Sequence, residues 1–246
     1  MRAFLVVVFV FGSANADARP ITERPVEVPI VAGTGYDALD VNRLSLIATP
    51  RSLVVDGTPI QFEHTPDLVI PQVKQVLQQR LDRFPGRAKA LTMFLDRATP
   101  YRSLIEIAVS AREAGVEELY FATQTSTGAV AAPLALPTAQ ELEASKVPGV
   151  MVSVLEREIL IWSRSGLEGT LAKPKRSIAL DHPHALRELT ATLDQIVQRW
   201  WLPRDLRTVS LQADADVPVQ TIAHVIGALR QTADGRVLFS SVALAG

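Results

Sequence analysis

The stretch LTMFLDRATPYRSLIEIAVSAREAGVEELYFAT, residues 91–123, sets the pattern from which the rest of the chain can be interpreted. An apolar run is followed by Thr99-Pro100, an amphipathic segment, Gly115 and a second apolar run. Threonine favours the N-cap, proline the first helical position and glycine the position after a helix, so this order predicts strand, helix and strand. Strands joined in this way are expected to be parallel, with a right-handed crossover. Earlier in the chain, Asp56-Gly57 follows the short apolar run 53–55 and predicts a tight turn after a strand.

The last forty residues repeat this pattern. A step of 118 positions without a gap keeps most apolar positions apolar. It pairs four identical residues: Asp96 with Asp214, Pro100 with Pro218, Arg112 with Arg230, and Phe121 with Phe239. Two segments, 67–84 and 184–201, have helical periodicity. At a step of 120 the apolar positions of the first fall on apolar positions of the second: Val69, Val73, Val76, Leu77 and Leu81 on Leu189, Leu193, Ile196, Val197 and Trp201. The sequence therefore predicts an α+β fold of two similar tandem modules. Each would be a small mixed sheet with two helices on one face, in the order strand, strand, helix, strand, helix, strand.

The predicted organisation has five parts. They are a signal peptide (1–16), a linker or arm (17–43), a first module (44–124), a linker (125–148) and a second module (149–246). The opening MRAFLVVVFVFGSANA has a basic start, a short apolar run and small residues, which is typical of cleavage between Ala16 and Asp17. The apolar run is shorter than the roughly 20 residues of a spanning helix. We expect export to the periplasm and a mature chain without a membrane span; the alternative is a retained N-terminal tether.

Composition narrows the classes of partner. Hydrophobic residues make up 48% and charged residues 21% of the chain, proportions typical of a folded protein. A formal net charge of -1 gives no electrostatic case for a nucleic-acid or anionic-membrane partner, which would need a concentrated basic face. The absence of cysteine excludes disulfides, thiolate metal sites and thiol nucleophiles.

The order strand, strand, helix, strand with Asp, turn with Pro, helix, Ala-Gly and strand resembles the periplasmic domain of the biopolymer-transport ExbD/TolR family. The residues that carry the resemblance are Val54-Val55-Asp56-Gly57, Asp96, Pro100, Tyr101, Ala114-Gly115 and 119–123. The second half lacks the Ala-Gly and the Tyr. The resemblance implies a domain that works as a dimer beside a proton-driven motor and contacts peptidoglycan or envelope proteins. Residues 3–12 contain no acid, unlike the family's membrane helix, which implies a free-standing tandem version without the motor function.

Candidate binding residues cluster where strands end and helices begin. Asp96 and Asp214 each follow a strand, the position at which ligands bind parallel sheets, although a carboxylate there more often binds backbone N–H groups. Tyr101 directly follows the turn residue Pro100, and Asp216 lies in the turn before Pro218. Trp200 ends the second long helix and is the aromatic residue we expect at a binding surface, whereas Trp201 occupies a core position of the repeat.

Asp181-His182-Pro183-His184 is the histidine cluster of the sequence, and it supports an alternative function. Asp181, His182 and His184 could supply part of a metal or enzymatic site, but no third zinc ligand is near in sequence. No nucleophile elbow, HExxH or phosphate-loop motif occurs. We therefore predict a non-catalytic binding protein without a cofactor, with a metal-binding protein or enzyme as the alternative.

Overall fold

The computed structural model describes residues 37–40, 42–61, 63–64, 66–86, 88–125, 128–136, 149–200 and 207–245. The predicted signal peptide, with Ala16 and Asp17, lies outside the described residues, as does Trp201. Within the described part, no helix is both long and apolar enough to cross a membrane.

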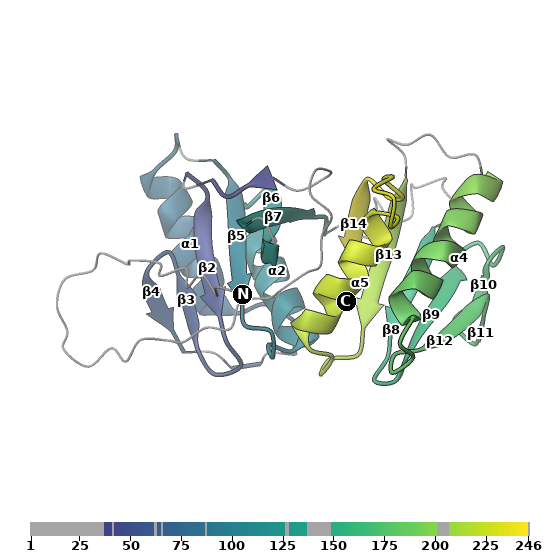
Figure 1. The fold of residues 1–246 in the computed structure, drawn as a ribbon. Helices are drawn as coiled ribbons and strands as arrows, with labels where there is room; N and C mark the ends of the chain where they lie inside the picture. Colours follow the sequence, from purple (N-terminus) through teal and green to yellow (C-terminus); the bar gives the residue numbers. More distant parts are fainter. Residues whose placement is uncertain are drawn as a thin grey trace, which may run out of the picture.

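The first half of the chain forms a seven-stranded mixed sheet (Figure 1). Its strands are β1 (Asp37–Ala38), β2 (Leu44–Ala48), β3 (Leu53–Val55), β4 (Thr58–Ile60), β5 (Ala90–Leu95), β6 (Glu118–Thr125) and β7 (Gly128–Leu134). Their order across the sheet is β1-β7-β6-β5-β2-β3-β4. The neighbours β2, β5 and β6 are parallel, and the strands on either side of them pair antiparallel.

The second half forms a five-stranded mixed sheet of order β12-β9-β8-β13-β14. Its strands are β8 (Val150–Val154), β9 (Glu158–Ser163), β12 (Arg176–Ala179), β13 (Thr208–Ala213) and β14 (Ser241–Leu244). Here β8, β13 and β14 are parallel, while β9 and β12 pair antiparallel. A short hairpin, β10 (Gly169–Thr170) and β11 (Lys173–Pro174), precedes β12. A Cβ at Gly169 would lie 2.5 Å from the carbonyl oxygen of Lys173, so only glycine fits there.

The strand order of the two halves corresponds. β6-β5-β2-β3-β4 matches β14-β13-β8-β9-β12 in order and in direction. The helices α1 (Pro71–Arg83) and α2 (Tyr101–Glu113) occupy the same places in chain order as α4 (Ala185–Trp200) and α5 (Val219–Arg230). The chain is thus α+β with mixed sheets. Each of these matched sets has one more strand before its first helix than the sequence predicts, β4 in the first half and β12 in the second.

Both helices of a half pack on the same face of their sheet. The chain steps across the sheet twice in one direction, and right-handed crossovers then place both helices on one side. Contacts between the helices agree with this: the hydroxyl of Ser110 in α2 accepts the N–H of Ile70 at the start of α1 (2.7 Å). In the second half, the hydroxyl of Thr190 in α4 donates to the carbonyl oxygen of Ala228 in α5 (3.1 Å).

Two turns predicted from the sequence are confirmed. Asp56 and Gly57 join β3 to β4 with φ angles of 45° and 80°, the left-handed pair that a two-residue hairpin needs. Gly115 follows α2 with φ 92°, the left-handed conformation that ends many helices.

The predicted helix starts are wrong by one to four residues. α1 begins at Pro71 rather than near residue 67, because proline disfavours helical backbone in the residue before it, and Ile70 is extended (φ -90°, ψ 104°). The N-cap of α2 is Pro100 rather than Thr99. The hydroxyl of Thr99 instead donates to the carbonyl oxygen of Ala48 (3.4 Å).

Two segments predicted to be linkers contain strands. β7 lies within 125–148 and pairs with β6 from Thr125 opposite Gly128 to Leu119 opposite Leu134. β1 lies within 17–43 and pairs with the other edge of β7. The sequence GAVAAPL is rich in alanine and includes a proline, so its own strand preference is weak, and pairing with β6 decides its conformation.

The ungapped step of 118 does not extend to the last strand. Met93 of β5 pairs with Phe121 of β6, whereas Leu211, one step beyond Met93, pairs with Leu244 of β14. Strand pairing therefore makes Leu244 the residue that corresponds to Phe121. Phe239, which the step of 118 matches with Phe121, lies five positions before it. A turn closed by a bridge between Gln231 and Val237 takes up the additional chain before β14.

The two halves meet at the starts of α2 and α5 (Figure 1), where they exchange backbone hydrogen bonds reciprocally. The four bonds run from the N–H groups of Tyr101, Val219, Arg102 and Gln220 to the carbonyl oxygens of Val217 (2.8 Å), Thr99 (2.8 Å), Ala215 (3.0 Å) and Arg97 (3.1 Å), respectively. The step of 118 converts each bond into its counterpart, so the contact has local two-fold symmetry. The first N–H groups of a helix lack partners within it. Among the described residues no side chain caps either helix, and each half supplies carbonyl groups to the other.

A second junction links the sheets themselves. Ala135, just after β7, bridges Ala243 of β14, with its N–H donating to Val242 (3.0 Å) and its carbonyl oxygen accepting from Leu244 (2.8 Å). Apolar side chains of both halves belong to one continuous core. The halves therefore share both backbone pairing and buried surface.

Candidate functional site

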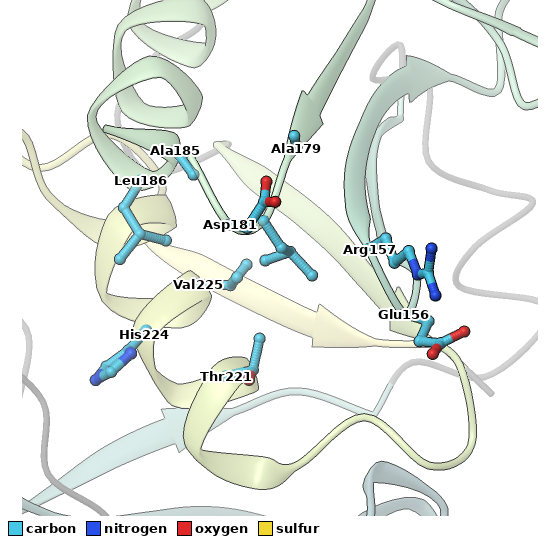
Figure 2. A pocket seen from close by; sticks show the side chains of 10 residues that line it. Glu156, Arg157, Ala179, Asp181, Ala185, Leu186, Thr221, His224 and Val225 are labelled. Atoms are coloured by element: carbon cyan, nitrogen blue, oxygen red, sulfur yellow. The ribbon is translucent and has the colours of Figure 1, made fainter. Parts of the chain in front are cut away.

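Two adjoining cavities lie between α4 and α5 on the helical side of the second sheet. The first, of about 720 Å³, is lined by the β8–β9 turn, the chain after β12, the start of α4 and one face of α5 (Figure 2). The second, of about 920 Å³, continues between the two helices to the chain after α5. Both are lined by Leu180, Ala185, Leu186 and His224. We call the combined feature the α4–α5 groove.

The polypeptide fixes the rim of this groove at the carboxyl ends of parallel strands. The N–H of Asp214, directly after β13, donates to the carbonyl oxygen of Val154 at the end of β8 (2.9 Å). Its Oδ2 accepts the N–H of Glu156 in the β8–β9 turn (3.1 Å). This edge of a parallel sheet is where ligands bind in many α/β proteins, so the groove is the candidate functional site.

Three of the chain's four histidines line the second cavity: His182, His184 and His224. The rings of His182 and His184 meet edge to face with centroids 5.8 Å apart, and Nδ1 of His182 accepts the N–H of His184 (3.2 Å). His224 lies on α5, and its Nε2 is 2.8 Å from the side-chain nitrogen of Gln220. The groove thus presents imidazole groups beside apolar side chains.

The residues of the alternative site, Asp181, His182 and His184, all line the α4–α5 groove, in its two different parts. Asp181 lines the first cavity, whereas His182 and His184 line the second. Within the described ranges, no group of three His, Asp or Glu side chains is placed to hold a metal ion. Elemental analysis of the purified protein remains the direct test of this alternative.

Ion pairs close the far end of the groove. Arg236 binds Asp194 of α4 (Nη2 to Oδ2, 3.1 Å) and Asp234 (Nε to Oδ2, 3.0 Å). Hydrogen bonds from the Thr232 hydroxyl and from Arg236 hold the pKa of Asp234 below its ordinary value. The acidic groups at this end are therefore neutralised locally. The remainder of the groove presents the histidines together with Glu156, Arg157, Asp181 and Arg187.

Asp96 and Asp214 have the backbone-binding role that the sequence favoured over ligand binding. Oδ1 of Asp96 accepts the N–H of Ala98 (2.8 Å), and Asp214 binds the β8–β9 turn as described above. Asp216 is exposed in the turn before α5. Of these three carboxylates, Asp214 alone adjoins the groove, through its bond to Glu156.

Tyr101 is wrong as a surface candidate, because only 2% of it is exposed. Its hydroxyl lies between the halves, 2.7 Å from the carbonyl oxygen of Ala245 and 3.1 Å from that of Leu211. Burial raises the pKa of Tyr101 above its ordinary value. The residue joins the halves rather than meeting a ligand.

Trp200 is half-buried, and its indole N–H donates to Oε1 of Glu168 (2.8 Å). Glu168 is almost completely buried and also binds Nη1 of Arg199 (2.8 Å). An indole that satisfies a buried carboxylate has a structural role. The indole N–H of Trp200 therefore has a partner within the protein, and binding of a ligand by its partly exposed ring stays a prediction.

A buried acid in the first half was missed by the sequence interpretation. Glu106 of α2 has a fully buried side chain that contacts Nδ1 of His64 (2.7 Å) and Nε of Arg102 (2.9 Å). The signal was present, since Glu106 interrupts a run of apolar residues on α2. At the step of 118, Gln220 and His224 stand where α2 has Arg102 and Glu106, which relates this cluster to the groove.

Comparisons with known proteins assign no family. No family model matches the sequence. No curated protein matches it either. Among solved structures, the chain is similar to the ethanolamine utilization protein EutJ from Carboxydothermus hydrogenoformans at 9% sequence identity, over 87% of each chain and with a TM-score of 0.21. A likeness at that TM-score carries no argument about fold or function.

Proposed function

We propose that this chain is an exported, non-catalytic binding protein of the cell envelope, built from two similar tandem modules that form a dimer within one chain. The observation that carries the proposal is the reciprocal contact at the starts of α2 and α5. A symmetric dimer uses the same patch on both partners, so that each contact occurs twice. Four backbone bonds related by one sequence step are the pattern expected if two copies of such a module were joined in one chain.

The corresponding strand order and the resemblance to the ExbD/TolR periplasmic domain support the same proposal. Domains of that family work as dimers next to peptidoglycan and envelope proteins, so peptidoglycan or an envelope transport protein is the proposed partner. The proposed work is binding, because the α4–α5 groove lies at the carboxyl ends of parallel strands and is lined by apolar, imidazole and charged side chains. Whether this single-chain dimer also forms a homodimer is measured by light scattering of the purified protein.

Localisation is tested first. Cell fractionation followed by mass spectrometry is expected to find the protein in the periplasm with a mature N-terminus at Asp17. A protein that keeps Met1 and remains with membranes supports the tethered alternative. A protein confined to the cytoplasm contradicts the proposal.

Binding is tested with the mature protein. We expect it to sediment with purified cell-wall sacculi or to crosslink to an envelope protein in intact cells. A variant with Leu186→Asp, which places a charge in the groove, is expected to lose the interaction. Gln195→Asp, on an exposed position of the same helix, is the matched control and is expected to retain it. Failure of the unaltered protein in both assays contradicts the proposed function.

A further inference from the structure

Equivalent faces of α2 and α5 differ in how much of them the rest of the chain covers. On α2 the three side chains of this face are buried: Ser103 (2% exposed), Glu106 (0%) and Ser110 (0%). At the step of 118, their counterparts on α5 are Thr221, His224 and Ala228, and all three are half-buried. The same helix face is therefore covered in the first half and partly open in the second.

The segment before α1 supplies the cover in the first half. The described residues of 61–70 are non-helical and lie along α2. Nδ1 of His64 is 2.7 Å from Oε2 of Glu106, and the N–H of Ile70 donates to the hydroxyl of Ser110 (2.7 Å). Leu68 of this segment packs against the core. In the second half only residues 180–184 separate β12 from α4. The face of α5 around His224 is left at the wall of the α4–α5 groove.

We propose that the α4–α5 groove binds a non-helical acidic peptide segment of a partner protein, in the manner in which the described residues of 61–70 lie on α2. In the first half the helix provides the acid, Glu106, and the segment provides the imidazole of His64. In the second half the helix provides the imidazole of His224, so the complementary group on the segment is a carboxylate. Leu180, Ala185 and Leu186 supply apolar contacts beside it, as the core does for Leu68.

This inference rests on the proposed function only in taking binding as the work of the chain, and its test does not depend on location or on the natural partner. The probes are two fluorescent ten-residue peptides: a copy of residues 61–70, QFEHTPDLVI, and the same peptide with His64→Glu. Fluorescence anisotropy with the full mature protein is expected to give about tenfold tighter binding of the His64→Glu peptide, the typical effect of one charge-assisted hydrogen bond.

Exchanging the charges supplies the decisive comparison. In the variant His224→Glu, which restores the acid found on α2, the preference is expected to reverse in favour of the unchanged copy. Gln195→Glu adds the same charge on an exposed position of α4 and is expected to keep the original preference. If His224→Glu does not fold, His224→Gln replaces it and is expected to remove the preference.

The proposal is overturned if neither peptide binds the unaltered protein, or if the preference is the same before and after the change at His224. These outcomes are separable from failure of the proposed function. Peptide binding with the expected reversal, combined with no interaction with sacculi or envelope proteins, overturns the envelope function and keeps the groove. Binding to sacculi or to an envelope protein, combined with no binding of either peptide, keeps the envelope function and overturns the proposed peptide site.

Discussion

Residues 61–70 and residues 180–184 connect equivalent elements of the two halves. The described residues of the first segment cover one face of α2, whereas the second segment leaves a groove beside α5. Proline positions account for the difference. Pro71 is the first residue of α1 and forces the preceding residues out of helical conformation. At the step of 120, Pro71 corresponds to Ala191, which lies inside α4. α4 begins at Ala185, shortly after Pro183 and six positions before the residue that corresponds to the start of α1. Displacing a helix start along the same fold thus converts a covered surface into a candidate site.

The largest expected effect concerns the contact between the halves, where Tyr101 and Val219 occupy equivalent positions. Tyr101→Ala removes a buried ring and a hydroxyl, and we expect it to lower the free energy of unfolding by about 3–5 kcal/mol. The matched change Val219→Ala removes less buried surface and should cost about 2 kcal/mol. Urea denaturation measures both. Equal losses would mean that the two helix starts contribute alike and that the tyrosine adds nothing.

The hydroxyl of Tyr101 is expected to contribute less than its ring. Tyr101→Phe leaves the carbonyl oxygens of Leu211 and Ala245 without this donor, so we expect a loss of about 1–3 kcal/mol near pH 7.

The difference in the free energy of unfolding between the unaltered protein and Tyr101→Phe should depend on pH. Burial raises the folded-state pKa of Tyr101, so above the ordinary tyrosine value of about 10 the unfolded chain loses this proton first. The stability contributed by the neutral phenol is complete below about pH 10 and falls as the pH rises above it. Unfolding measured from pH 7 to 11 should therefore show a narrowing difference, and a constant difference would contradict the burial of this hydroxyl.

Each half contains one almost fully buried glutamate, and the second is tested through Trp200. Trp200→Phe keeps an aromatic ring but removes the N–H that binds Glu168, and we expect a loss of about 1–2 kcal/mol. Trp162→Phe is the matched control, because the indole of Trp162 donates to the neutral hydroxyl of Ser153 (2.9 Å). Its expected loss is about 0.5–1 kcal/mol. A larger effect at Trp162 would show that the carboxylate does not need the indole.

The buried glutamate of the first half should respond more weakly to loss of one partner. His64→Ala is expected to lower the free energy of unfolding by about 1 kcal/mol, because Arg102 still binds Glu106 and the His64 side chain is 45% exposed. His184→Ala, at an exposed histidine of the groove, should leave the midpoint of urea denaturation unchanged. A neutral result for His64→Ala would mean that residues 61–70 cover α2 without this contact.

The sequence by itself determined the features that depend on a few neighbouring residues. Asp56-Gly57 predicts its hairpin, Gly115 predicts the end of α2, and the spacing of apolar residues predicts the helices and the central strands. In these cases, local backbone preference and the periodicity of one buried face are sufficient. The start of α1 was missed although its signal, Pro71, is equally local.

Only the tertiary structure decided which of the predicted binding residues are buried and which helix faces remain accessible. Tyr101 is buried because the other half of the chain packs against it, and β7 is a strand because β6 offers it hydrogen-bonding partners. Five additional residues before β14 shift the register that the identity of Phe121 and Phe239 suggested. The α4–α5 groove exists because the chain before α4 does not reach across α5. Such features depend on contacts between segments distant in sequence, which no local pattern records.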